Sequence, residues 1–361
     1  YKRQEQTREA YMAALFAEIG GRAKDYSDRT VTSIFIGGGT PSLLSGEQIG
    51  QLMDRIREQF AMAQDAEITM EVNPGTASAE KLRNFYTAGI NRLSIGMQSA
   101  QAEELKNLGR IHDFEGFCQV YREAVEAGFT NINVDIMSGL PGQTLASYRD
   151  TLEKVLHLEP MPQHISAYSL IVEEGTPFAA MAERGELPLP EEETERAMYE
   201  ETIEVLAKYG FHRYEISNYA RDGYECRHNV GYWIRRDYLG FGIGAASLID
   251  NVRFQNEKSL GAYLAHPLES REEEQTLTVQ DRMEETMFLG LRLTRGVSCV
   301  DFAEQYGRTV EEVYGEVIAR NVADGLLTVT ERKENQKKDR FLALTKRGLD
   351  LSNYVMAQFL F

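Results

Sequence analysis

The sequence predicts an α/β protein: a partial (β/α)6 barrel of the TIM type, followed by a smaller α+β domain that resembles a winged helix. Between residues 31 and 216, six short apolar segments alternate with amphipathic helical segments, a pattern typical of parallel βαβ units. Glycines and polar residues follow these apolar segments, as expected where a barrel assembles its ligand site. After residue 276 the pattern changes to three helical segments and a hairpin.

The elements of the barrel follow in order after an amphipathic helix at about 4–24. The expected strands are 31–36, 67–72, 91–96, 130–136, 163–170 and 211–216. The expected helices are about 47–60, 77–88, 100–108, 114–127, 143–157 and 195–209. Gly89 and Gly128 directly follow two of these helices, the usual position of a C-cap. Six strands joined by crossover helices favour a partial barrel over a doubly wound sheet.

We expect three parts: the barrel at 1–222, a connecting region at 223–275 and the C-terminal domain at 276–361. The connecting region is rich in glycine and aromatic residues and contains Trp233, the only tryptophan. The C-terminal helices are expected at 278–293, 299–306 and 310–323, the strands at 325–330 and 340–345, and a final helix after them. For this domain, a role in packing or in contact with another protein is favoured over DNA binding.

Composition excludes several classes of protein. The formal net charge is −17, which argues against a general nucleic-acid binder that must neutralise phosphates. The three cysteines, Cys118, Cys226 and Cys299, are far apart, so a secreted disulfide framework is not expected and a cytoplasmic location fits better. The sequence contains no stretch of about 18 apolar residues, so no transmembrane segment is predicted. The sequence is compatible with peripheral contact with an acceptor in a membrane. It is also compatible with a homodimer.

The loop Gly37-Gly-Gly-Thr-Pro41 follows the first expected strand. Three glycines let the backbone turn tightly and approach a ligand without a Cβ in the way. Pro41 stiffens the exit and disfavours helical dihedrals at Thr40. A tight βα turn would explain the loop alone, but polar residues follow the other strands too.

Those residues are Glu71, Gln98, Asp135 and the hydroxyls of Tyr168 and Ser169. In a barrel the carboxyl ends of the strands meet at one mouth, and Arg110 follows closely enough to reach it. Carboxylates accept hydrogen bonds from an ammonium or a ribose diol, and an arginine binds a carboxylate. A mouth that contains both carboxylates and an arginine predicts a zwitterionic nucleoside ligand.

A second polar and aromatic group lies at 214–220 and 224–233. It places Cys226, His228, Tyr232 and Trp233 within a few residues. Aromatic faces beside a histidine or a thiol are suited to the edge of a haem, whose iron takes either as axial ligand. The alternative is a packed corner with Trp233 buried and His228 hydrogen-bonded.

The motifs of the mouth resemble those of the oxygen-independent coproporphyrinogen III oxidase family of radical S-adenosylmethionine enzymes. They are Gly37–Pro41, Glu71–Pro74, Ser94–Ser99, Leu108–His112 and Asn133–Gly142. The resemblance implies a barrel that binds S-adenosylmethionine across its mouth. It implies that Gly38, Gly39 and Thr40 take the amino group, and that Glu71, Gln98, Arg110 and Asp135 hold the other polar atoms.

The sequence departs from this family in one respect. The resemblance implies a 4Fe-4S cluster held by a CxxxCxxC loop, which would lie upstream of Tyr1, and none of the three cysteines has a neighbouring thiol. We therefore expect the chain to be a truncated or partial form of a longer protein. As written, it is not expected to bind the cluster at the usual site or to cleave S-adenosylmethionine reductively.

The segment from His228 to Trp233 resembles the HNxxYW motif of HemW-type haem chaperones. This implies a protein that binds haem and transfers it to an acceptor protein, with little or no decarboxylase activity. His228 is the first candidate haem ligand and Cys226 the second. The alternatives are a coproporphyrinogen III oxidase and a non-catalytic module that binds a partner.

Overall fold

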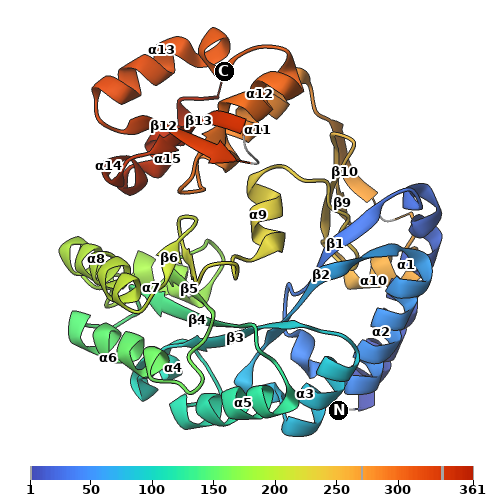
Figure 1. The fold of residues 1–361 in the computed structure, drawn as a ribbon. Coiled ribbons are helices and arrows are strands. Elements are labelled where there is room, and N and C mark those ends of the chain that lie inside the picture. Colours follow the sequence, from blue (N-terminus) through green and yellow to red (C-terminus); the bar gives the residue numbers. More distant parts are fainter. Residues whose placement is uncertain (1, 270, 335–336, 361) are drawn as a thin grey trace.

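The computed structural model describes residues 2–269, 271–334 and 337–360. Within these ranges the main sheet has seven strands, in the order β1-β2-β3-β4-β5-β7-β6. Their bounds are β1 Thr30–Ile36, β2 Ala61–Val72, β3 Arg92–Gln98, β4 Ile132–Ser138, β5 His164–Ser169, β6 His212–Arg213 and β7 Asn218–Ala220. Strands β1 to β5 are parallel, and the sheet curls into the predicted partial barrel (Figure 1).

The prediction was wrong at the sixth strand. Only His212–Arg213 forms β6, and the unpredicted β7 lies between β5 and β6 and runs antiparallel to both. The chain reverses because the carboxylate of Glu215 accepts hydrogen bonds from the backbone N–H of Ser217 at 2.7 Å and from Nδ2 of Asn218 at 2.6 Å. These bonds close a turn where a longer strand was expected.

Helices cover the outer face of the sheet (Figure 1). They are α1 Lys2–Arg22, α2 Gly46–Gln59, α3 Ala79–Thr87, α4 Ala102–Asn107, α5 Phe114–Ala127, α6 Leu145–Leu156 and α8 Glu192–Lys208. A further helix, α7 Pro177–Glu183, has no buried residue. Their starts follow ordinary capping chemistry: Ser45 and Gln48 form a capping box on α2, and Asp113 accepts from the N–H of Gly116 at 2.8 Å. Helix α7 was not predicted, and it begins at the Thr176 cap and Pro177.

The strands alternate apolar and polar side chains. In β2, Ile68, Met70 and Val72 belong to the core shared with the outer helices, so Glu67, Thr69 and Glu71 point into the barrel because successive side chains of a strand face opposite sides. The inner face of this barrel is therefore polar, which is unusual for a packed core and suits a ligand site.

The connecting region contains helix α9 (Arg227–Trp233), helix α10 (Leu260–Ala265) and an antiparallel sheet of strands β8 (Ala246–Ile249), β9 (Val252–Asn256) and β10 (Arg271–Thr276). Helix α9 lies in the opening of the barrel, between its sheet and the C-terminal helices (Figure 1).

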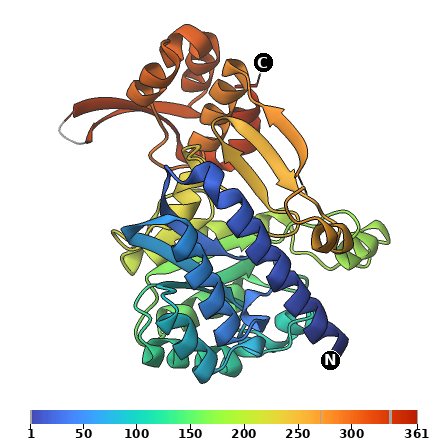
Figure 2. The same cartoon turned by 90° about the vertical axis from the view of Figure 1, so that its right-hand side faces the viewer.

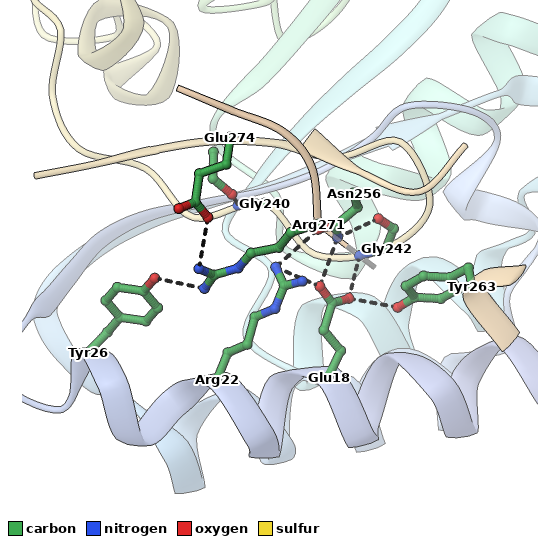
Figure 3. A network of polar contacts seen from close by, with 10 residues as sticks. Glu18, Arg22, Tyr26, Gly240, Gly242, Asn256, Tyr263, Arg271 and Glu274 are labelled. Atoms are coloured by element: carbon green, nitrogen blue, oxygen red, sulfur yellow. Dashed lines mark hydrogen bonds and ion pairs between the residues drawn. The ribbon is translucent and has the colours of Figure 1, made fainter. Parts of the chain in front are cut away.

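A buried polar network joins α1 to this region (Figure 3). The carboxylate of Glu18 is fully buried, lies 3.0 Å from Nη1 of Arg22, and accepts from Asn256 Nδ2 at 2.7 Å and from the Tyr263 hydroxyl at 2.7 Å. It also accepts from the backbone N–H of Gly242 at 2.9 Å. Because these groups have no access to water, each depends on the others for hydrogen bonds.

The C-terminal part has the predicted helices followed by a hairpin. Its elements are α11 Val279–Gly290, β11 Val297–Ser298, α12 Cys299–Tyr306, α13 Val310–Ala323, β12 Leu327–Glu334, β13 Lys337–Leu344, α14 Lys346–Asp350 and α15 Ser352–Ala357. The expected final helix is two short helices. This part has its own apolar core, and its hairpin extends away from the barrel (Figure 2). The boundaries between the three parts stay a prediction.

None of the helices in the described ranges combines the length and apolar character that crossing a bilayer requires.

Candidate functional site

A cavity of about 260 Å³ lies inside the half-barrel. Its wall combines carboxylates, amides, hydroxyls, one guanidinium and two aromatic rings. The lining residues are Phe35, Glu71, Arg92, Ser94, Asn133, Asp135, Ser166, Tyr168, Ser217, Asn218 and Asn229. The cavity therefore reaches from the predicted mouth to helix α9.

The glycine loop and Glu71 are in direct contact. A Cβ on Gly37 would lie 2.9 Å from the carboxyl carbon of Glu71 and 2.7 Å from Cε1 of Phe35, so a larger residue there would displace these side chains. Gly38 has a φ of +80°, and its backbone N–H donates to the Glu71 carboxylate. Gly39 and Thr40 continue the loop, and the carbonyl of Thr40 accepts from the N–H of Leu43 at 3.0 Å.

Glu71 and Asp135 are close enough to affect each other's charge. Burial, followed by repulsion from Asp135, raises the pKa of Glu71. Burial also raises the pKa of Asp135, while hydrogen bonds from Asn133 at 2.7 Å and Ser94 at 3.2 Å oppose that shift. Two neighbouring carboxylates with spare acceptor sites are stabilised by a ligand that brings an ammonium group or hydroxyls.

Gln98 and Arg110 complete the mouth. Gln98 ends β3 with a φ of +70°, a rare conformation for this residue type that is often found at ligand sites. Its Oε1 accepts from the Tyr168 hydroxyl at 2.9 Å. Burial raises the pKa of Tyr168, and the nearby charge of Arg110 opposes this shift. The structure thus brings the glycine loop, Glu71, Gln98, Arg110 and Asp135 to one end of the barrel.

The two candidate haem ligands lie on a different element, at the start of α9. This turn is attached to the barrel by Glu67, a residue that is 7% exposed. Glu67 accepts from the backbone N–H of Arg227 at 3.1 Å and of His228 at 3.2 Å, and the Cys226 thiol lies 3.5 Å from it. A carboxylate at the N-terminus of a helix is electrostatically favourable, so β2 holds α9 in the opening.

His228 and Cys226 differ in their surroundings. The His228 ring stacks on Phe35 at 5.0 Å and meets Tyr232 edge-on at 4.8 Å, and its Nδ1 lies 3.3 Å from Oγ of Ser33. Burial lowers the pKa of His228 to about 4, so its imidazole is neutral near pH 7. No group in the described part of the chain is hydrogen-bonded to its Nε2. Cys226 is fully buried, and burial raises the pKa of its thiol to about 11.

The far end of α9 is joined to the C-terminal part. The guanidinium of Arg292 lies over the Trp233 ring at 4.3 Å, and Arg235 donates to Glu285 of α11 at 2.8 Å. Helix α9 therefore connects the barrel interior with the C-terminal helices.

Sequence reasoning missed most of the inner wall: Arg92, Ser94, Asn133, Ser166, Asn218 and Asn229. The alternation of polar and apolar residues in Arg92-Leu-Ser94 and Asn133-Val-Asp135 was the available signal, because residues two apart share a face of a strand.

Known proteins agree with this architecture. Residues 3–155 match the model of the radical SAM superfamily, and residues 277–351 match the HemN C-terminal domain. "Heme chaperone HemW" of Bacillus subtilis (strain 168) is 38% identical over 364 residues, covering 99% of this chain and 93% of its own. The chain belongs to the HemW family of the radical SAM superfamily.

A second HemW relative supports this assignment, and a solved structure shares the fold. "Heme chaperone HemW" of Escherichia coli (strain K12) is 35% identical, covering 88% of this chain and 83% of its own. The solved structure of coproporphyrinogen III oxidase (HemN) from Escherichia coli, a radical SAM enzyme, superposes with a TM-score of 0.82 at 26% identity, covering 98% of this chain and 84% of that one. The HemW relatives favour the haem chaperone over the oxidase alternative.

Proposed function

We propose that this HemW-family chain binds haem at the start of helix α9 and transfers it to an acceptor protein. The observation that carries the proposal is the environment of His228. Its imidazole is neutral near pH 7, it is oriented by two aromatic rings, and its Nε2 has no hydrogen bond within the described ranges. A neutral imidazole with one free nitrogen is the usual protein ligand of haem iron. The sulfur of Cys226 is less suitable, since it is buried against Glu67.

We further propose that the barrel mouth binds S-adenosylmethionine. The glycine loop, Gln98, Arg110 and the two carboxylates offer acceptors for an ammonium group and a ribose, and a cation for a carboxylate. The raised pKa values of Glu71 and Asp135 support this, because a cationic ligand would relieve their repulsion.

The residues present do not fit a 4Fe-4S cluster. Cys118 lies in α5, Cys226 precedes α9 and Cys299 begins α12. The described ranges contain no group of three or more histidine, cysteine, aspartate or glutamate side chains that could hold a metal.

The haem proposal is tested by titrating the chain with haem and following the Soret band. We expect saturable binding with a stoichiometry near one, and loss of the bound spectrum when an apo-haem protein is added as acceptor. Unsaturable absorbance growth would contradict haem binding. The physiological acceptor, a homodimer and a cytoplasmic location stay predictions.

Two other functions remain testable. Vinyl product at catalytic turnover, in an anaerobic assay of the full-length protein with its cluster reconstituted and coproporphyrinogen III as substrate, would overturn the chaperone in favour of the oxidase. A non-catalytic partner-binding module would gain support if neither haem nor S-adenosylmethionine bound.

The carboxylates of the mouth give a direct prediction. Glu71→Ala and Asp135→Ala should each weaken S-adenosylmethionine binding by about tenfold or more, because each removes a charge-assisted hydrogen bond. Calorimetric titration measures the affinity, and Glu115→Ala, at an exposed position on α5, is the matched control. Unchanged binding in both mouth variants would refute the site.

The pH dependence of haem binding follows from the lowered pKa of His228. Its folded-state pKa is about 4, so protonation should compete with iron only near and below that pH. Between pH 8 and pH 5.5 we expect less than about a twofold change in haem affinity. If the histidine had the ordinary pKa of about 6.5, haem affinity would fall by about tenfold by pH 5.5. That result would contradict the assignment.

A further inference from the structure

Among the described residues that line the barrel cavity, Arg92 is the only cationic one. It is 2% exposed, and no hydrogen bond or ion pair of its side chain occurs within the described ranges. Its Nε is buried without a partner. Burying a charge without a partner is costly, so this arrangement calls for an explanation.

The nearest carboxylates do not supply that partner. Asp135 accepts from Asn133 and Ser94, and Glu67 accepts from two backbone N–H groups of α9. Asp135 is near enough for attraction, since the charge of Arg92 counts among the causes that lower its pKa. Attraction at a distance still leaves the guanidinium donors of Arg92 without acceptors.

The rest of the cavity near Arg92 is lined by neutral hydrogen-bonding groups. Ser94, Ser166, Asn218 and Asn229 share its wall. At about 260 Å³, the space is below the range that holds a whole drug-sized ligand. It is large enough for a short side arm with an anionic end.

We propose that this pocket binds the carboxylate of an aliphatic side arm through Arg92, and that the arm is a haem propionate. This rests on the proposed function. The haem source is favoured by position: Phe35 lines the cavity and stacks on His228, so the anion pocket and the candidate iron ligand share a wall. The S-adenosylmethionine carboxylate has the same chemistry, and the experiment separates the two.

The test compares haem with its dimethyl ester, in which both carboxylates are blocked. Arg92→Met should weaken haem binding by about tenfold to a hundredfold, the range expected for loss of a charge-assisted contact. The affinity for the ester should be the same in the variant and the wild type. An equal loss for haem and ester would overturn the proposal, because it would reflect a general disturbance.

Two further variants control for folding. Asn229→Asp keeps the side-chain shape and adds a negative charge to the same wall, so it should also weaken haem but not the ester. Arg92→Lys should recover part of the affinity, since it keeps the charge without the guanidinium fork. If Asn229→Asp leaves haem binding unchanged while Arg92→Met is unfolded, the proposal is overturned.

Two more measurements separate the sources and the hypotheses. Arg92→Met should change the affinity for S-adenosylmethionine by no more than about twofold. If the variant loses affinity for S-adenosylmethionine alone, Arg92 belongs to that ligand's site and the haem-propionate proposal is overturned. Sodium propionate, followed by amide chemical shifts, probes the pocket without haem. If propionate shifts the amide signals only when Arg92 is present, but the chain binds no haem, the pocket binds a carboxylate. That result would reject both the assignment of the carboxylate to haem and the proposed function. Haem binding insensitive to Arg92→Met would reject only the pocket.

Discussion

Replacing His228 by alanine is expected to weaken haem binding by about a hundredfold or more and to shift the Soret maximum. The substitution removes the neutral imidazole that stacks on Phe35 and with it the proposed bond to iron. The backbone N–H that holds the start of α9 to Glu67 remains, so the fold should be preserved. Spectral titration gives the affinity, and circular dichroism checks the folding.

Two variants complete this experiment. His266→Ala removes an exposed imidazole at the end of α10 and should bind haem as the wild type does. Cys226→Ser tests the second candidate ligand. Retained affinity in His228→Ala, together with loss in Cys226→Ser, would reverse the assignment and show that the thiol leaves its buried contact with Glu67.

Replacing Glu18 by alanine should lower the free energy of unfolding by about 3–5 kcal/mol, the usual cost of breaking a buried ion pair on one side. The substitution leaves the guanidinium of Arg22, which is 3% exposed, with Asn256 as its remaining hydrogen-bond partner at 3.0 Å. It also removes the acceptor of the Tyr263 hydroxyl. Denaturant unfolding followed by circular dichroism measures the change.

The control for this prediction lies on the same helix. Glu9→Ala, at an exposed position of α1, should change stability by less than about 0.5 kcal/mol. Glu18→Gln keeps hydrogen-bond acceptor capacity and should fall between the two. A loss below about 1 kcal/mol for Glu18→Ala would show that the network in Figure 3 adds little to the attachment of α1.

These contacts give α9 a central place in the molecule. Its start is held by Glu67 of the barrel, and its end contacts the C-terminal part through Trp233 and Arg235. A ligand at His228 would therefore lie at the barrel end of the helix that joins the two parts.

The sequence by itself determined the five parallel strands, the glycine loop at the first strand end and the helices of the C-terminal part. These features depend on neighbouring residues: the alternation along a strand, the period of a helix, and caps such as Asp113 before α5. The physical reason is that side-chain direction and capping act within one or two turns of chain.

Only the tertiary structure decided the rest. The reversal at Glu215, the attachment of α9 by Glu67 about 160 positions earlier, and the burial of Arg92 all depend on segments far apart in sequence. Arg92 at the start of a strand is indistinguishable from a solvent-exposed charge until the sheet curls and α9 covers the opening. Curvature and long-range packing turned an alternating strand pattern into the wall of a polar cavity.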